Sequence, residues 1–164
     1  MPEINKSSRH SKITGDFAEG IVLYWLSKHG FESARVDHTG IDLIARNPLN
    51  NELMGISVKS RSRATGTEKD YLGIPNDNFE KVNKACEAFN CIPYFAIVID
   101  ANETISVFIL SQKKLLELYP MGKSICTWKM GDKYLEKYKL DKEIIIFQFK
   151  HETINWWENN NKNN

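Results

Sequence analysis

Three charged residues, Glu19, Asp42 and Lys59, are of the types that hydrolyse phosphodiester bonds with a divalent metal ion. This chemistry needs carboxylate oxygens to hold a hard cation, and a base or cation that positions the attacking water. Asp42 lies near the start of the apolar segment Ile41–Arg46, and Lys59 ends the segment Leu53–Lys59. The short polar turn between the segments suits a hairpin, which would bring Asp42 and Lys59 together.

The same side chains also have explanations that involve no catalysis. Asp42 could accept hydrogen bonds in the preceding turn, Lys59 could be solvated at a strand end, and Glu19 could favour the dipole near a helix start. We favour a functional role for Asp42, because a carboxylate inside an apolar strand needs a reason. We favour a functional role for Lys59 as well, because it occurs together with Asp42. For Glu19, both interpretations stay open.

The elements that must position these residues follow from the apolar periodicity. A helix is predicted from a Thr14 cap to about His29, followed by three antiparallel strands, a polar loop at 60–70 and a second helix at 77–90. Further strands are predicted at 94–99, 105–110 and 144–149, with a short helix capped by Ser111. Residues 121–142 show no clear period. This order predicts an α/β fold with a mixed central sheet flanked by helices.

Length and composition are those of one globular domain. We expect a flexible basic arm at 1–12, a single domain at 13–157 and a disordered Asn-rich tail at 158–164. The net charge of +1 gives no global basicity. Apolar runs are too short for a membrane span, and no secretory signal is visible, so we expect a cytoplasmic protein without a membrane partner. Cys86, Cys91 and Cys126 are expected to be free thiols, although the first two could bridge.

Several segments together resemble a known group of nucleases. They are Lys12 to Glu19, Lys28-His29-Gly30-Phe31, Arg35, Ile41-Asp42-Leu43-Ile44-Ala45, Ile56-Ser57-Val58-Lys59 and Pro93-Tyr94-Phe95-Ala96-Ile97. Their order and spacing resemble the PD-(D/E)-x-K nuclease superfamily, which has the restriction-endonuclease-like fold, and within it the archaeal-type Holliday-junction resolvases. Each motif is weak alone.

The resemblance implies roles for individual residues. Asp42 would bind Mg²⁺ or Mn²⁺, with the Val58 carbonyl as a second ligand. Lys59 would orient or activate the water, and Glu19 would hold the outer shell of the metal or a second ion. Arg35 would approach a phosphate.

Position 57 departs from the pattern, because the family usually has Glu or Asp where this chain has Ser57. A hydroxyl is a poorer ligand than a carboxylate. The second predicted helix could supply the missing acid through Glu80, as some superfamily members do, or the polar loop could supply Glu68. Alternatively, metal binding is lost and the domain only binds nucleic acid.

Basic residues near this predicted site could contact DNA phosphates. Arg61 and Arg63 follow Lys59 directly, and Lys12 could add to the same surface. A second basic stretch, 128–139, interleaves lysines with aromatic residues. This pattern suits base stacking, but packing of the aromatic rings on the sheet is our default interpretation.

The sequence therefore predicts a metal-dependent endonuclease that hydrolyses DNA phosphodiester bonds. The alternative is a catalytically silent module on the same scaffold that binds nucleic acid or protein, for which Ser57 is the motivation. A partner subunit of a defence system is a third option without direct support. DNA is the expected partner, and the resemblance to resolvases implies a homodimer, although no residue identifies an interface.

Overall fold

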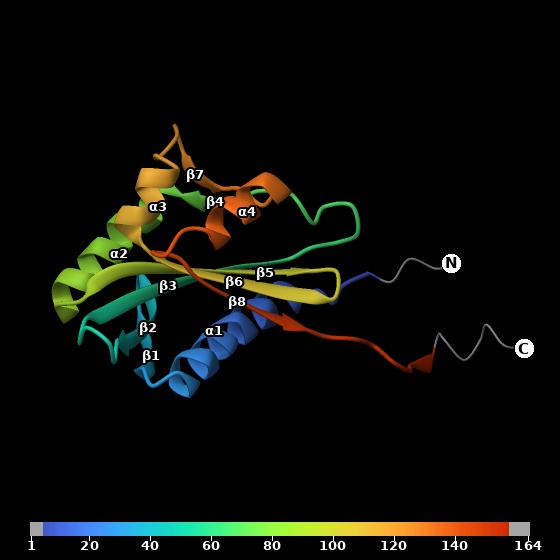
Figure 1. Cartoon of the computed structure of the whole chain (residues 1–164), viewed down its shortest axis with the longest axis horizontal. Helices are drawn as coiled ribbons and strands as arrows, with labels where there is room; N and C mark the ends of the chain where they lie inside the picture. The colour runs from blue at the N-terminus through green and yellow to red at the C-terminus, as the bar shows by residue number, and fades with distance from the viewer. Residues whose placement is uncertain (1–4, 158–164) are drawn as a thin grey trace, which may run out of the picture.

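A six-stranded mixed sheet with the order β1-β2-β3-β5-β6-β8 runs through the centre of the protein, in a computed structural model that describes residues 5–157 (Figure 1). A two-stranded sheet pairs β4 with β7. The elements are α1 (His10–Lys28), β1 (Glu32–His38), β2 (Ile41–Arg46), β3 (Leu53–Ser62), β4 (Leu72–Pro75), α2 (Asn76–Phe89), β5 (Ile92–Ala101), β6 (Thr104–Ser111), α3 (Gln112–Leu118), β7 (Ile125–Trp128), α4 (Asp132–Lys139) and β8 (Ile145–Lys150).

Strand pairing confirms the predicted meander. β1 pairs with β2 and β2 with β3, both antiparallel, while β3 pairs with β5 in parallel. A parallel pair needs a crossover connection, and α2 lies in the segment that provides it. β5, β6 and β8 then continue antiparallel to the far edge. The central sheet with helices on both faces is therefore the predicted α/β architecture.

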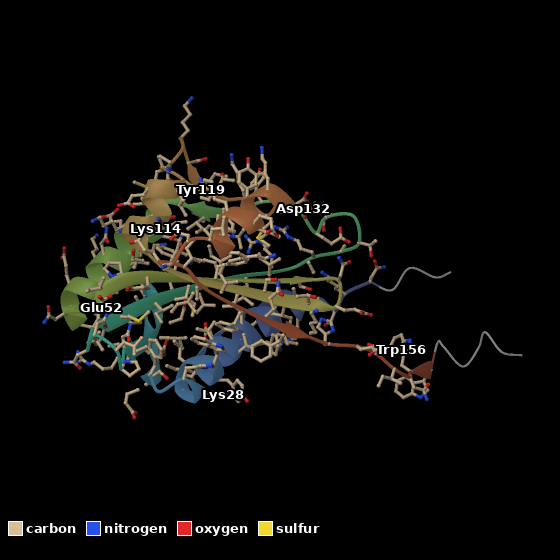
Figure 2. The ribbon with its side chains drawn as sticks, in the orientation of Figure 1. Lys28, Glu52, Lys114, Tyr119, Asp132 and Trp156 are labelled. Carbon is tan, nitrogen blue, oxygen red and sulfur yellow. The ribbon has the colours of Figure 1, made fainter. Side chains whose placement is uncertain are left out.

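Helices cover both faces of this sheet. Figure 1 shows α1 on one side, with α2, α3, α4 and the small β4–β7 sheet on the other. In Figure 2, Lys28 of α1 lies on the side of the sheet opposite to Lys114, Tyr119 and Asp132. Two clusters of buried apolar residues result, one around Ala18, Val22 and Leu26 beneath the sheet and a larger one around α2 above it. Each face therefore has its own core.

The first helix begins earlier than predicted. It starts at His10 with Arg9 as its N-cap residue, so residues 10–12 do not belong to a flexible arm. The Thr14 hydroxyl donates to the His10 carbonyl oxygen at 2.7 Å, inside the helix, instead of capping it. Threonine can make this bond to the carbonyl one turn back, which is why the sequence pattern was misleading. Residues 1–4 of the predicted arm, and the predicted tail at 158–164, lie outside the described residues.

The predicted loop and the patternless segment also contain regular structure. β3 continues to Ser62, which shortens the loop predicted at 60–70, and β7 and α4 lie within 121–142. β7 has only four residues and pairs with β4, about fifty positions earlier, so local periodicity carries little signal. Trp128 and Tyr138 are buried and stack at 4.2 Å, which confirms packing as their role.

Two further features of the described residues concern the cysteines and the helices. Cys86, Cys91 and Cys126 are free thiols, and the first and last are buried. Within residues 5–157, no helix combines the length and the apolar character that crossing a membrane requires.

The turn before Asp42 provides a test of the packing. Gly40 has φ of +109°, and a Cβ there would lie 2.3 Å from the Lys81 carbonyl oxygen of α2. We expect Gly40→Ala to lower the free energy of unfolding by about 2–4 kcal/mol, from backbone strain and from the clash with α2. Urea denaturation would measure it.

Gly66→Ala is the matched control, because Gly66 also has positive φ, +91°, but nothing lies within 4 Å of its added Cβ. This variant should lower the free energy of unfolding by about 1 kcal/mol, from backbone strain alone. Equal losses in both variants would show that α2 does not press against the turn.

Candidate active site

The strands β2 and β3 separate at the position of Asp42. Their ladder runs from Arg46 opposite Leu53 to Leu43 opposite Ile56 and ends there, while β3 continues along β5 to Ser62. The Val58 N–H would therefore lack a strand partner on the β2 side. The Asp42 carboxylate takes this place: its Oδ2 accepts from the Val58 N–H at 2.7 Å. Asp42 is thus fixed in the gap between the two strands.

The Val58 carbonyl faces the same gap. In a strand, the N–H and the C=O of one residue point to the same side. Since the Val58 N–H points to Asp42, its carbonyl oxygen is directed toward β2 as well, beyond the end of the ladder. A carbonyl and a carboxylate oxygen on adjoining strands suit a hard divalent cation.

Lys59 approaches from the face of β3 that α2 covers. Its Nζ donates to the Asn78 Oδ1 in the first turn of α2, at 2.5 Å. Burial lowers the pKa of the Lys59 ammonium, and the nearby negative charge of Asp42 opposes that shift. Lys81 lowers this pKa further, and Asp77 raises it. Lys59 is therefore a desolvated cation that is electrostatically coupled to Asp42.

Glu19 reaches the region from α1, below the sheet. Burial is the main cause that raises the pKa of Glu19, and the negative charge of Asp42 is the next, so the two carboxylates lie close enough to repel each other. Arg35 of β1 lowers this pKa in part through an ion pair, with Nη1 2.7 Å from the Glu19 Oε2. A cation bound near Asp42 would relieve the remaining repulsion. In this structure, the predicted phosphate contact Arg35 is a partner of Glu19.

Ser57 lies on β3 and is 2% exposed. It shares a face with Lys59, because alternate residues of a strand point the same way. No three or more His, Cys, Asp or Glu side chains gather as a metal site among residues 5–157. The oxygen donors that remain, from Asp42, Val58 and Glu19, are of the type that a hard divalent cation takes, and water or a phosphate would complete the shell.

The structure does not bring Glu80 or Glu68 to this position. The Glu80 side chain is 70% exposed and pairs with Lys84 along the outer face of α2, at 2.9 Å. Glu68 accepts from the Gly66 N–H inside its own loop, at 2.8 Å. The acid of α2 that influences Lys59 is Asp77, which also accepts from the Asn78 Nδ2 at 3.3 Å. Sequence reasoning missed Asp77 and Asn78, and no local motif marks them.

The predicted DNA-contacting residues divide into two kinds. Arg61 is exposed at the end of β3 and lines an open polar groove together with Lys6, His10, Ser60 and other residues. Lys12 is exposed on α1 and pairs with Asp16 at 3.5 Å. Arg63 instead holds the following loop, because its Nη2 donates to the carbonyl oxygens of Asp70 and Tyr71 at 3.2 and 2.8 Å.

Comparison with known proteins also indicates a nuclease. No family model matches the chain. A crossover junction endodeoxyribonuclease from Sulfolobus islandicus rod-shaped virus 1 is 33% identical over 108 residues, which cover 60% of this chain and 83% of the viral protein.

The fold resembles that of a solved nuclease structure. A Holliday junction resolvase from the archaeal hyperthermophile Archaeoglobus fulgidus superposes with a TM-score of 0.53 at 19% identity, over 70% of this chain and 83% of the resolvase. A bacterial homing endonuclease gives 0.48 at 13% identity, over 74% and 80% of the two chains. The resolvase likeness confirms the restriction-endonuclease-like fold expected from the sequence.

The charges around Lys59 yield a test that needs no substrate. Asp42→Asn removes the negative charge that stabilises the ammonium, so we expect the pKa of Lys59 to fall further below its ordinary value. Lys81→Gln removes a repelling cation and should raise this pKa. Titration of the Lys59 ¹³Cε resonance by NMR would measure both. If neither variant moved the titration, Lys59 would not share the site with Asp42.

Proposed function

This chain belongs to the family of crossover junction endodeoxyribonucleases, and we propose that it hydrolyses phosphodiester bonds of branched DNA with a divalent metal ion held at Asp42. One observation supports this function above the others. Asp42 is fixed between the diverging strands by the Val58 N–H, and it is electrostatically coupled to Glu19 from one face of the sheet and to Lys59 from the other.

Each residue has a role that follows from its surroundings. Asp42 and the Val58 carbonyl would hold Mg²⁺ or Mn²⁺, and Glu19 would bind water in its outer shell. The ion would act as a Lewis acid and lower the pKa of a bound water. Lys59, held by Asn78, would orient the attacking water and stabilise negative charge that develops on the phosphate.

Because residue 57 is a serine, we expect metal binding at this site to depend on the DNA substrate. With two carboxylates in place of three, we expect weak metal binding by the free protein, and a DNA phosphate oxygen would complete the ligand set. The competing function is a silent nucleic-acid-binding module, in which Ser57 marks the loss of metal binding. Burial is the main cause that raises the pKa of Glu19, and the negative charge of Asp42 adds to it; this second contribution supports the first function, because a bound cation would offset the two negative charges.

DNA would approach along the polar groove at the end of β3. Lys6 is fixed there, with Nζ 2.6 Å from the Ser62 carbonyl oxygen, and Arg61 lines the same groove. Lys12 lies on the neighbouring helix. These cations would contact the phosphate backbone and make binding depend on salt.

A homodimer would place two such sites on paired strands of a branched substrate. Ile13, Phe17 and Tyr24 are 54%, 51% and 55% exposed and lie on one face of α1 at helical spacing, which supports a partner surface there.

We further propose that the region from His10 to Trp157 acts as a single nuclease domain, and that the free thiols belong to a reducing, cytoplasmic environment.

Cleavage of a synthetic four-way DNA junction tests the roles of Asp42 and Lys59. We expect Asp42→Asn and Lys59→Met each to lower the Mg²⁺-dependent rate by about 100-fold or more, because one removes a ligand and the other the positioning cation. Glu80→Gln is the control and should cleave at the wild-type rate, since Glu80 faces away from the site. A wild-type protein that binds the junction without cutting it in Mg²⁺ or Mn²⁺ would establish the silent module instead.

Metal binding tests the meaning of Ser57. We expect Ser57→Asp to bind Mn²⁺ at least about tenfold more tightly than the wild type in calorimetry without DNA, because a carboxylate adds a strong oxygen donor. Wild-type affinity should rise when junction DNA is present. If the Ser57→Asp variant folds, as judged by circular dichroism, and still binds no more tightly, then position 57 does not face the metal.

A further inference from the structure

Two thiols lie directly behind β3, next to Gly55. A Cβ added at Gly55 would be 2.6 Å from the Cys91 Sγ and 2.7 Å from the Cys86 Sγ, so both sulfurs occupy the space that a side chain would fill. Burial, followed by the neighbouring Cys91 thiol, raises the pKa of Cys86 to about 12. The two sulfurs are therefore neighbours in one small, mostly apolar space.

The backbone holds these residues at a suitable separation. The Cys91 N–H donates to the Cys86 carbonyl oxygen at 2.9 Å, and Asn90 between them has φ of 51°, which turns the chain from the end of α2 toward β5. With this hydrogen bond, standard bond lengths keep the two Cα atoms within the range of roughly 4.4–6.8 Å that disulfides show. This separation allows the two sulfurs to bond.

We propose that Cys86 and Cys91 form an intramolecular disulfide when the protein meets a small oxidising disulfide such as oxidised glutathione. Cys91 is half-buried, whereas Cys86 is 3% exposed, so Cys91 reacts first. Its thiolate attacks one glutathione sulfur and releases one glutathione, which takes up the proton. Cys86 then attacks the Cys91 sulfur, and the second glutathione leaves with the Cys86 proton. Two protein thiols are oxidised, and one disulfide is reduced to two thiols.

The bond would fasten the end of α2 to the start of β5. Gly55 pairs with Pro93 of β5, and it shares a face of β3 with Ser57 and Lys59. The disulfide would therefore stiffen the support behind the candidate active site without occupying it. This inference does not depend on the proposed function.

The experiment uses the full chain, reduced and then incubated with oxidised glutathione, quenched with acid and alkylated in denaturant. We expect intact mass spectrometry to show the loss of two hydrogens, and peptide mapping to join Cys86 to Cys91 with Cys126 alkylated. The melting temperature should rise by about 4–8 °C, because the bridge restricts the unfolded chain.

Three variants separate this pair from the remaining thiol. Cys86→Ser and Cys91→Ser should each lose the internal crosslink and the rise in melting temperature, while Cys126→Ala should keep both. Three alkylated thiols in the oxidised wild type, glutathione that stays attached to Cys91, or a bridge that includes Cys126 or a second chain would overturn the proposal. The wild-type peptide map distinguishes these outcomes even if a variant fails to fold.

Discussion

Beyond Leu43 and Ile56 the strands β2 and β3 no longer pair, and the Val58 N–H needs another acceptor, because unpaired backbone donors inside a protein are costly. The Asp42 carboxylate meets this need and is held at the same time between the two faces of the sheet. Glu19 can therefore influence it from α1, and Lys59 from the α2 side. The arrangement of the candidate site follows from this one hydrogen bond.

The electrostatics of the site are a balance between repulsion and burial. Glu19 and Asp42 repel each other, and the ion pair between Arg35 and Glu19 offsets part of this repulsion. Lys59 loses solvent but gains the Asn78 oxygen and the charge of Asp42. At 2% exposure, a third carboxylate in place of Ser57 would add desolvation and repulsion. Serine thus favours the folded protein, at the expense of a metal ligand.

The helix α2, which packs on one face of the sheet, holds the residues of the candidate site in place. The first turn of α2 supplies Asn78 to Lys59, and the carbonyl of Lys81 lies against Gly40 in the turn that leads to Asp42. The end of α2 brings Cys86 to Gly55. One helix therefore contacts both strands of the gap, and its packing on β3 and β5 fixes the position of the site.

Apolar patterns in the sequence determined the meander, the buried β5 and the helical faces by themselves, because these patterns are local. They also placed Asp42 and Lys59 on adjoining strands. Only the tertiary structure decided that Asn78 and Asp77, and neither Glu80 nor Glu68, accompany Lys59, because the position of α2 along β3 depends on contacts between distant segments. The pairing of β7 with β4 and the meeting of Cys86 and Cys91 at Gly55 likewise depend on contacts between distant segments. Such contacts leave no periodic trace in the sequence.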